Sequence, residues 1–156
     1  MNPVPDSPVL FVSTTNTFRS RFAEAIFNHG ASRNRIGVRA ISRGLDPGQS
    51  LEDSLSPYVE GALHSRHLSL SLTGPTKRTL QVRDLHDALR VIAVNEREHH
   101  AAIVQACPDL AFKVDCWQVE DLSRWEPERI IAHLEQECVS LLRSLRTRPI
   151  AAVALS

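Results

Sequence analysis

The residues best placed to do chemistry lie together near the N-terminus, in the run S-T-T-N-T-F-R-S at residues 13–20. The run follows four apolar residues typical of a buried strand and precedes apolar residues at helical spacing. The unpaired N–H groups at a helix start sit at the positive end of its dipole, so a tight loop entering a helix can bind an oxyanion. The candidate phosphate-binding residues are Ser13, Thr14, Thr15, Asn16, Thr17, Phe18, Arg19 and Ser20.

Two residues of this run favour anion binding more than the others. Arg19 carries a planar group that can hold two oxyanion oxygens at once. Asn16 tolerates the positive φ that turns successive N–H groups inward. Ser, Thr and Asn are also common where a helix is simply capped, so the residues alone leave an anion site and an ordinary capped helix about equal.

The pattern of elements favours a site at the edge of a parallel sheet. Strands are expected at about 8–12, 38–42, 90–95 and 112–117, and helices at about 19–30, 82–88, 96–106 and 127–145. The first helix should end near Gly30, where a glycine can take the left-handed conformation of a cap. The segment 51–63 is expected to form two short helical pieces around Pro57, and residues 68–72 alternate like a strand. Alternating strands and helices predict a three-layer α/β/α fold with a central four-stranded parallel sheet. Such sheets bind ligands beyond the carboxyl ends of their strands, where the loop at 13–20 begins.

The loop resembles the signature loop of the low-molecular-weight protein tyrosine phosphatases, in which a Cys is followed by five residues, an Arg and a Ser or Thr. Here Ser13 occupies the position of that Cys, and Asn16, Arg19 and Ser20 match the pattern. The resemblance continues in the family's order through 23–25, 42–45, 91–99 and 117–122 and covers about residues 8–146. It implies the family's α/β fold, with the phosphate-binding loop between the first strand and the first helix.

The resemblance also implies roles for the site residues. In the family, a thiolate at the position of Ser13 attacks phosphorus, the arginine at the position of Arg19 holds the phosphoryl oxygens, and a distant Asp protonates the leaving group. The matching Asp is Asp121, with Asp109 and Asp115 as weaker candidates; without the family, Asp121 would be read as a solvated or capping carboxylate. The helix dipole can ionise a thiol, but a serine hydroxyl needs a neighbouring base or metal, and none is evident near Ser13. Phosphate binding should therefore survive while turnover collapses.

Several positions depart from the family pattern. Thr15 replaces a usual Gly, Phe18 replaces a frequent second Cys, and Leu122 stands where a Pro usually follows the acid. The family's paired tyrosines are missing, which leaves Trp125 as the nearby aromatic, although a core Trp is the simpler interpretation of that residue. The pair His99-His100 has no metal-ligand spacing and is expected at the surface.

These observations leave three functions to compare. The first is a phosphatase of this family acting on phosphotyrosine or a small phosphomonoester, with Ser13 as a trapping substitution or a natural loss. A single recent change is favoured by the intact neighbours, which are Asn16, Arg19, Ser20 and Asp121. The second is a natural pseudophosphatase that binds phosphate, another oxyanion or a phosphorylated protein. The third, arsenate reduction, needs a cysteine relay that Cys107, Cys116 and Cys138 do not supply.

Composition sets the outer limits of these interpretations. The chain has 156 residues, enough for one domain, with 18 basic and 18 acidic side chains and no global basic field to attract nucleic acid or acidic membrane. The three cysteines lack disulfide or zinc spacing, and no apolar run is long enough to span a bilayer. We therefore expect a cytoplasmic protein with no cofactor and no metal, made of an extended leader at 1–7, the phosphatase-like domain at 8–146 and a tail at 147–156. The sequence specifies no oligomeric state.

Overall fold

Four parallel strands form the centre of the molecule. The computed structural model describes residues 7–51 and 54–147. The strand order across the sheet is β2-β1-β3-β4, so β1 lies inside the sheet with a neighbour on each side. The strands are β1 (Val9–Ser13), β2 (Ala40–Gly44), β3 (Arg90–Ala93) and β4 (Val114–Cys116). The predicted four-stranded parallel sheet is confirmed.

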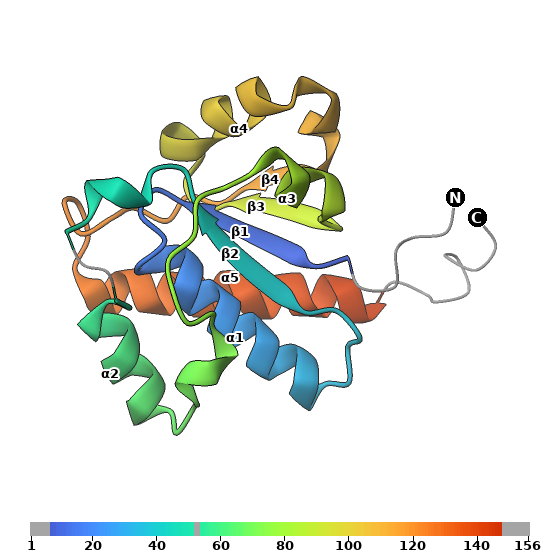
Figure 1. Cartoon of the computed structure of the whole chain (residues 1–156). Coiled ribbons are helices and arrows are strands. Elements are labelled where there is room, and N and C mark those ends of the chain that lie inside the picture. Colours follow the sequence, from blue (N-terminus) through green and yellow to red (C-terminus); the bar gives the residue numbers. More distant parts are fainter. Residues whose placement is uncertain (1–6, 52–53, 148–156) are drawn as a thin grey trace.

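Helices cover both faces of this sheet and make the outer layers (Figure 1). On one face α1 and α5 pack against each other, and α3 and α4 lie on the opposite side. The α-helices are α1 (Arg19–Arg33), α2 (Pro57–Ser65), α3 (Val82–Asp87), α4 (Ala101–Ala106) and α5 (Pro127–Thr147). Short 3₁₀ turns span Pro47–Gln49, Leu70–Leu72 and Pro108–Lys113, and a π-helical turn spans Glu96–His100. Within the described part of the chain, no helix combines the length and the apolar character that crossing a membrane requires.

Strand β1 is buried on both faces and links two hydrophobic clusters. Phe11 belongs to the larger cluster, which it shares with residues of α1 and α5. Leu10 and Val12 belong to the second cluster, on the side of α3 and α4. This explains why β1 reads as an uninterrupted apolar run, as is typical of a strand in a parallel sheet. The loop that follows β1 is therefore anchored to the most buried strand of the sheet.

The helix that follows the loop is longer than predicted. We expected it to end near Gly30 with a glycine cap, but α1 continues to Arg33. Gly30 has a packing role instead, because a Cβ there would lie 2.4 Å from Cδ1 of Leu142 on α5. The glycine lets α5 approach the back of α1. The prediction was wrong because both a helix cap and a close contact between helices favour glycine, and the sequence alone does not distinguish them.

Two other local predictions were wrong. The alternation of Leu70 and Leu72 with serines does not form a strand; these residues make a 3₁₀ turn in which Ser69 accepts a hydrogen bond from the N–H of Ser71. Pro57 does not interrupt a helix but begins one, because Ser56 is the N-cap and a proline is well accommodated at the first helical position. Strand β2 also runs from Ala40 to Gly44 rather than over 38–42. Residues 1–6 of the predicted leader and residues 148–156 of the predicted tail lie outside the described residues.

Candidate functional site

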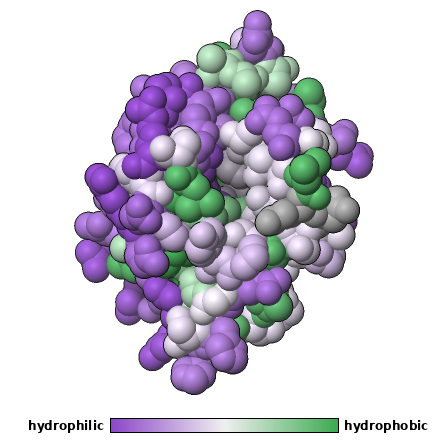
Figure 2. All heavy atoms as spheres, turned by 90° about the vertical axis from the view of Figure 1, so that its left-hand side faces the viewer, coloured by the Kyte–Doolittle hydropathy of each residue, from purple (hydrophilic) through white to green (hydrophobic). Residues whose placement is uncertain are grey.

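The loop between β1 and α1 lines a cavity at the carboxyl end of the sheet. This cavity has a volume of about 320 Å³. Figure 2 looks onto this end of the molecule, where residues of intermediate hydropathy surround a hollow and hydrophobic residues appear as separate patches. The residues of the loop itself are joined there by residues from four other segments. The lining residues are Ser13, Thr14, Thr15, Thr17, Phe18, Arg19, Gln49, Glu98, Asp121, Leu122, Ser123 and Ile130.

The backbone of the loop is held from outside through its carbonyl groups. Four of these carbonyls accept hydrogen bonds of 2.8–3.4 Å from other segments. They belong to Ser13, Thr14, Asn16 and Thr17, and the donors are the N–H groups of Leu45, Asp46 and Ser56 and the guanidinium of Arg21. In a trans peptide the next N–H points opposite to the carbonyl, so the amides of Thr14, Thr15, Thr17 and Phe18 point away from these donors. Among the described residues, no acceptor bonds to those four N–H groups.

Asn16 is the central support of the loop. It is fully buried, and its φ of 59° is the left-handed conformation that the sequence predicted. Its Nδ2 donates to Ser20 Oγ at 2.8 Å and to Ser42 Oγ at 3.0 Å, and its Oδ1 accepts from the N–H of Arg78 at 2.9 Å. Gly44 lies close behind, where a Cβ would come within 2.8 Å of the carbonyl oxygen of Thr14. The curvature of the loop therefore depends on one asparagine and one glycine.

Arg19 is held in one orientation at the base of the cavity. Its side chain is only 7% exposed. Nη1 donates to Glu98 Oε2 at 2.7 Å and to the carbonyl of Val119 at 2.9 Å, while Nη2 donates to Glu98 Oε1 at 2.8 Å. These bonds leave Nε–H and the second Nη2 hydrogen without a partner among the described residues. Because both lie on one edge of the guanidinium, Arg19 still has a two-pronged edge for an oxyanion.

Glu98 is positioned in turn by the turn that follows β3. Its N–H donates to Oδ1 of Asn95 at 3.1 Å, and the Thr14 hydroxyl donates to its Oε1 at 3.5 Å. Burial alone would raise the pKa of Glu98, but the hydrogen bonds and charge of Arg19 outweigh burial and hold that pKa below its ordinary value. The carboxylate is therefore ionised at neutral pH and acts as a fixed counter-charge to Arg19.

His99 lies beneath the same network. We expected it at the surface, but it is fully buried. Its Nδ1 accepts a hydrogen bond of 3.2 Å from the N–H of Asn95, so Nε2 carries the hydrogen and donates to Thr14 Oγ1 at 3.0 Å. Burial and the charge of Arg19 lower the pKa of His99 to about 4. With Nδ1 already occupied, His99 is neutral and has no lone pair free to act as a base.

Ser13 is buried at the end of β1 with its hydroxyl already engaged. It is 3% exposed, and its Oγ lies 2.6 Å from Ser20 Oγ. The network beyond Ser20 leads through the amide of Asn16 to Ser42 and then to the carboxylate of Glu24. The Asn16 amide donates to both serines, and an amide that donates in both directions cannot relay a proton from Ser13 to Glu24. The structure thus provides Ser13 with a hydrogen-bond partner but with no general base among its contacts.

Asp121 reaches the same cavity from the segment after β4. Its Oδ1 accepts hydrogen bonds from the N–H of Ser123 at 3.0 Å and from the hydroxyl of the same residue. Burial would raise the pKa of Asp121, but these two bonds and the charges of Arg19 and Arg97 hold it below its ordinary value. Asp121 therefore lines the cavity as an ionised carboxylate whose Oδ1 accepts two hydrogen bonds from Ser123.

The remaining candidates are divided between the site and the rest of the molecule. Phe18 lines the cavity and packs against Tyr58 with ring centroids 5.8 Å apart. Trp125 lies outside the cavity lining and stacks under Arg129, whose guanidinium carbon is 4.0 Å from the ring centroid. Asp115 pairs with Arg90, and neither Asp109 nor Asp115 lines the cavity. In the described ranges, no group of three His, Cys, Asp or Glu side chains is arranged to hold a metal ion.

Sequence reasoning missed the roles of Glu98, His99 and the Thr14 hydroxyl. One signal was available: residues 95–99 follow β3, which is the neighbour of β1 in the sheet. Polar residues after two adjacent parallel strands meet at the same edge, so Glu98 could have been placed near the loop. Nothing in the sequence shows that Glu98 pairs with Arg19 or that His99 is buried.

Comparisons with known proteins agree with this architecture. A family model described as low molecular weight phosphotyrosine protein phosphatase matches residues 8–149. The crystal structure of YfkJ from Bacillus subtilis superposes with a TM-score of 0.81 at 21% identity, covering 90% of this chain and 95% of that one. The low molecular weight protein tyrosine phosphatase from T. tengcongensis has a TM-score of 0.74 at 25% identity, covering 92% and 100%.

A third similar structure is a cysteine-to-serine mutant of the arginine phosphatase YwlE with a phosphorylated active-site serine. It has a TM-score of 0.77 at 24% identity, and the match covers 90% of this chain and 97% of that one. A comparison with curated protein sequences finds no match.

Proposed function

Because the chain belongs to the low molecular weight phosphotyrosine protein phosphatase family, we propose that it binds a phosphoryl group in the loop at 13–20 and hydrolyses it poorly. The observation that carries this proposal is the state of Ser13, whose buried hydroxyl is hydrogen-bonded to Ser20 and contacts no base. We therefore expect this chain to keep the groups that bind phosphate and to lack those that break the phosphate ester bond.

The binding half of the proposal is supported by the loop and by Arg19. The loop carbonyls are held from outside, so the N–H groups that follow them are free for a ligand. Arg19 is buried and oriented by Glu98, and one edge of its guanidinium is unused. Donors that are already in place cost little reorganisation when an oxyanion arrives. Phosphate, a phosphomonoester or a phosphorylated protein side chain meets these requirements.

The loss of turnover is supported by the chemistry at two positions. Attack by Ser13 on phosphorus requires its proton to leave, and no neighbouring group accepts it. Departure of the leaving oxygen is helped by a protonated acid, whereas Asp121 is held ionised by Ser123. Both the attack of Ser13 on phosphorus and the departure of the leaving group are therefore expected to be slow.

A second candidate function keeps slow hydrolysis through a phosphoserine at position 13. It is favoured by the similar structure whose active-site serine is phosphorylated, since in that relative a serine accepts the phosphoryl group. In this chain the Ser13 oxygen would bond to phosphorus as the bond from phosphorus to the leaving oxygen breaks. The Ser13 proton would leave with that oxygen, and water would later release phosphate.

One set of measurements tests the proposal. Isothermal titration with inorganic phosphate should show binding by the natural chain, while hydrolysis of p-nitrophenyl phosphate should be close to background. Incubation with a phosphomonoester followed by mass spectrometry should detect phosphorylation at Ser13 only if the second candidate holds. Hydrolysis that returns in Ser13→Cys would place the loss at that position alone, whereas binding without recovery would indicate a binding module. Efficient turnover by the natural chain, or no phosphate binding, would refute the proposal.

A further inference from the structure

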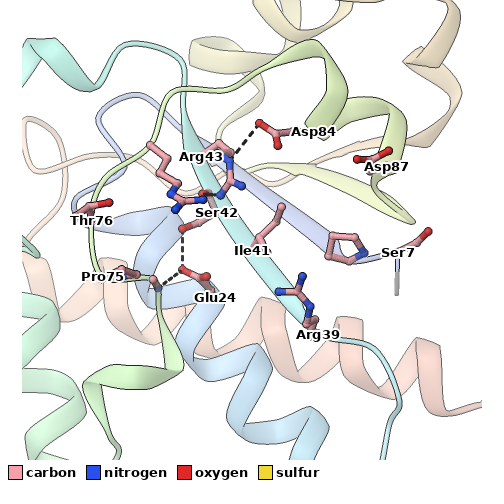
Figure 3. Close-up of a pocket in the computed structure, with 13 residues that line it drawn as sticks. Ser7, Glu24, Arg39, Ile41, Ser42, Arg43, Pro75, Thr76, Asp84 and Asp87 are labelled. Carbon is pink, nitrogen blue, oxygen red and sulfur yellow. Dashed lines mark hydrogen bonds and ion pairs between the residues drawn. The ribbon is translucent and has the colours of Figure 1, made fainter. Parts of the chain in front are cut away.

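A second and larger cavity lies along β2, which is an edge strand of the sheet (Figure 3). Its volume is about 530 Å³. None of its lining residues also lines the cavity at the phosphate loop. Three guanidinium groups and three carboxylates border it. They belong to Arg39, Arg43, Arg78, Glu24, Asp84 and Asp87.

Only one of the two aspartates in the lining has a cationic partner. Asp84 Oδ2 accepts from Arg43 Nε at 3.2 Å, a pair that Figure 3 shows across the upper part of the cavity. The same Asp84 oxygen accepts from the N–H of Gln81 at 2.9 Å, so it also caps α3. Asp84 is therefore not free to neutralise the remaining arginines, whereas Asp87 has no ion pair among the described residues.

The third carboxylate, Glu24, is committed to the interior. It is 6% exposed and accepts hydrogen bonds from Ser42 Oγ at 2.7 Å and Thr73 Oγ1 at 2.5 Å. Its charge is balanced by Arg21, whose guanidinium donates to Thr73 and to the carbonyl of Gly74. Glu24 thus forms part of the wall with its acceptor capacity largely used.

After this accounting, Arg39 and Arg78 remain. In the described segments neither has an ion-pair partner, and both are exposed. They come from different parts of the chain. Arg39 immediately precedes β2, and the carbonyl of Arg78 accepts a hydrogen bond from Gly44, the last residue of β2. Figure 3 shows Arg39 directed toward Ile41, whose side chain, with Pro75, adds apolar surface to the cavity.

We propose that this cavity is a second anion site, which takes a small molecule carrying phosphate or carboxylate groups between Arg39 and Arg78. Arg39 and Arg78 outnumber the one carboxylate of the lining that has no ion pair, Asp87, and each planar guanidinium can donate paired hydrogen bonds to an oxyanion. The volume admits an organic body as well as the charged group, and Ile41 and Pro75 offer it apolar contact. The sequence carries no motif for such a site.

The site would stand back to back with the phosphate loop. The N–H of Arg78 holds Oδ1 of Asn16 at 2.9 Å, and Nδ2 of Asn16 holds Ser42 Oγ at 3.0 Å. Asn16 therefore separates the two anion sites and contacts the wall of the second one. The guanidinium of Arg78 is not part of this bond, so it can be replaced without removing the support of the loop.

The test is isothermal titration of the full chain at constant ionic strength with two probes, inorganic pyrophosphate and citrate. The double variant Arg39→Gln/Arg78→Gln should weaken binding at the second site by at least tenfold. Arg83→Gln is the matched control, because Arg83 is an exposed arginine on α3 that does not line the cavity. It should bind as the natural chain does. Tighter binding of pyrophosphate would identify a phosphate ligand, and tighter binding of citrate a carboxylate ligand.

The two sites are distinguished by Arg19→Ala. The natural chain should bind two equivalents of pyrophosphate, Arg19→Ala should retain the equivalent at the second cavity, and the double variant should retain the one at the loop. If the loop fails to bind, the natural chain shows one equivalent that Arg19→Ala leaves unchanged and the double variant removes. The inference is overturned if the double variant binds like the natural chain, or if Arg83→Gln weakens binding equally. Circular dichroism melting of each variant verifies that it is folded.

Discussion

The two cavities beside β2 and β1 use the same residue type in different ways. At the phosphate loop, Arg19 is buried and oriented by a carboxylate and a carbonyl before any ligand arrives. Behind β2, Arg39 and Arg78 are exposed and have no such supports in the described structure. Binding to a group that is already ordered costs less side-chain entropy. The comparison teaches that the cavity at the phosphate loop has an arginine fixed in place before binding, whereas the second cavity would have to order its arginines when a ligand binds.

The largest expected effect is a loss of folding stability at acidic pH, which arises from His99 beside the phosphate loop. His99 lies beneath the cavity at the phosphate loop, and its pKa is lowered to about 4 from the ordinary value of 6.5, whereas no histidine lines the second cavity. Between pH 6.5 and 4 the unfolded chain binds a proton that the folded chain excludes, so stability is full above pH 6.5 and falls as the pH drops toward 4. The expected loss is about 3 kcal/mol.

Urea unfolding at pH 7 and pH 4 measures that loss. His99→Gln keeps a donor for Thr14 but removes the titration, so this variant should lose less stability than the natural chain over the same interval. Equal losses in both proteins would show that other groups cause the acid sensitivity.

Replacing Arg19 should break the comparison at the level of binding. Arg19→Ala removes two charge-assisted hydrogen bonds to an oxyanion, so phosphate affinity at the loop should fall by about 100-fold. Arg39→Ala should leave that affinity unchanged, because Arg39 does not line the cavity at the phosphate loop. Titration calorimetry with inorganic phosphate measures both. An equal effect of the two substitutions would mean that the loop is not the phosphate site.

Gly44→Ala tests whether phosphate binding depends on the backbone conformation of the loop at 13–20. The added Cβ would lie 2.8 Å from the carbonyl oxygen of Thr14, so the loop must move, at a cost of about 2 kcal/mol in stability. Phosphate affinity should fall with it, since the displaced peptide positions the loop amides. Gly37→Ala is the control, because a Cβ at Gly37 meets nothing within 4 Å. Thermal unfolding and phosphate titration together report the two effects.

Glu98→Ala gives the smallest expected change and sharpens the interpretation of Arg19. If Glu98 orients Arg19, its removal should weaken phosphate binding by about tenfold, or 1.4 kcal/mol. If Glu98 instead competes with phosphate for Arg19, affinity should rise. Glu96→Ala is the control, as Glu96 lies on the same turn but is exposed and does not line the cavity. The sign of the change in phosphate affinity decides between the two roles.

The fold was largely predictable because its strongest signals are local. The short apolar run of β1 is typical of a buried strand, and the apolar stripe of α5 repeats with the helical period. Errors arose where a residue has two meanings, as with Gly30, which permits a helix contact instead of a cap, and Pro57, which starts a helix instead of breaking one. Such choices depend on tertiary neighbours that the local sequence does not specify.

The candidate site was predictable only in its first segment. The positive φ of Asn16 and the placement of Arg19 at a helix start follow from local chemistry. The pairing of Arg19 with Glu98 joins residues 79 positions apart, and the burial of His99 depends on packing beneath Thr14. The lowered pKa of Asp121 likewise depends on hydrogen bonds from Ser123 and on the charges of Arg19 and Arg97, which come together only in three dimensions.

The π-helical turn at Glu96–His100 has a consequence for how this chain can change. A π turn accommodates one more residue than an α turn, and here it allows Glu98 to reach Arg19 while the adjacent His99 reaches Thr14. Shortening this turn by a single residue would alter the phase of the helix and separate the two contacts. The spacing of the chain here matters as much as its chemistry, because deleting one residue of this turn would break the contacts that orient Arg19 while Arg19 and the loop residues are retained.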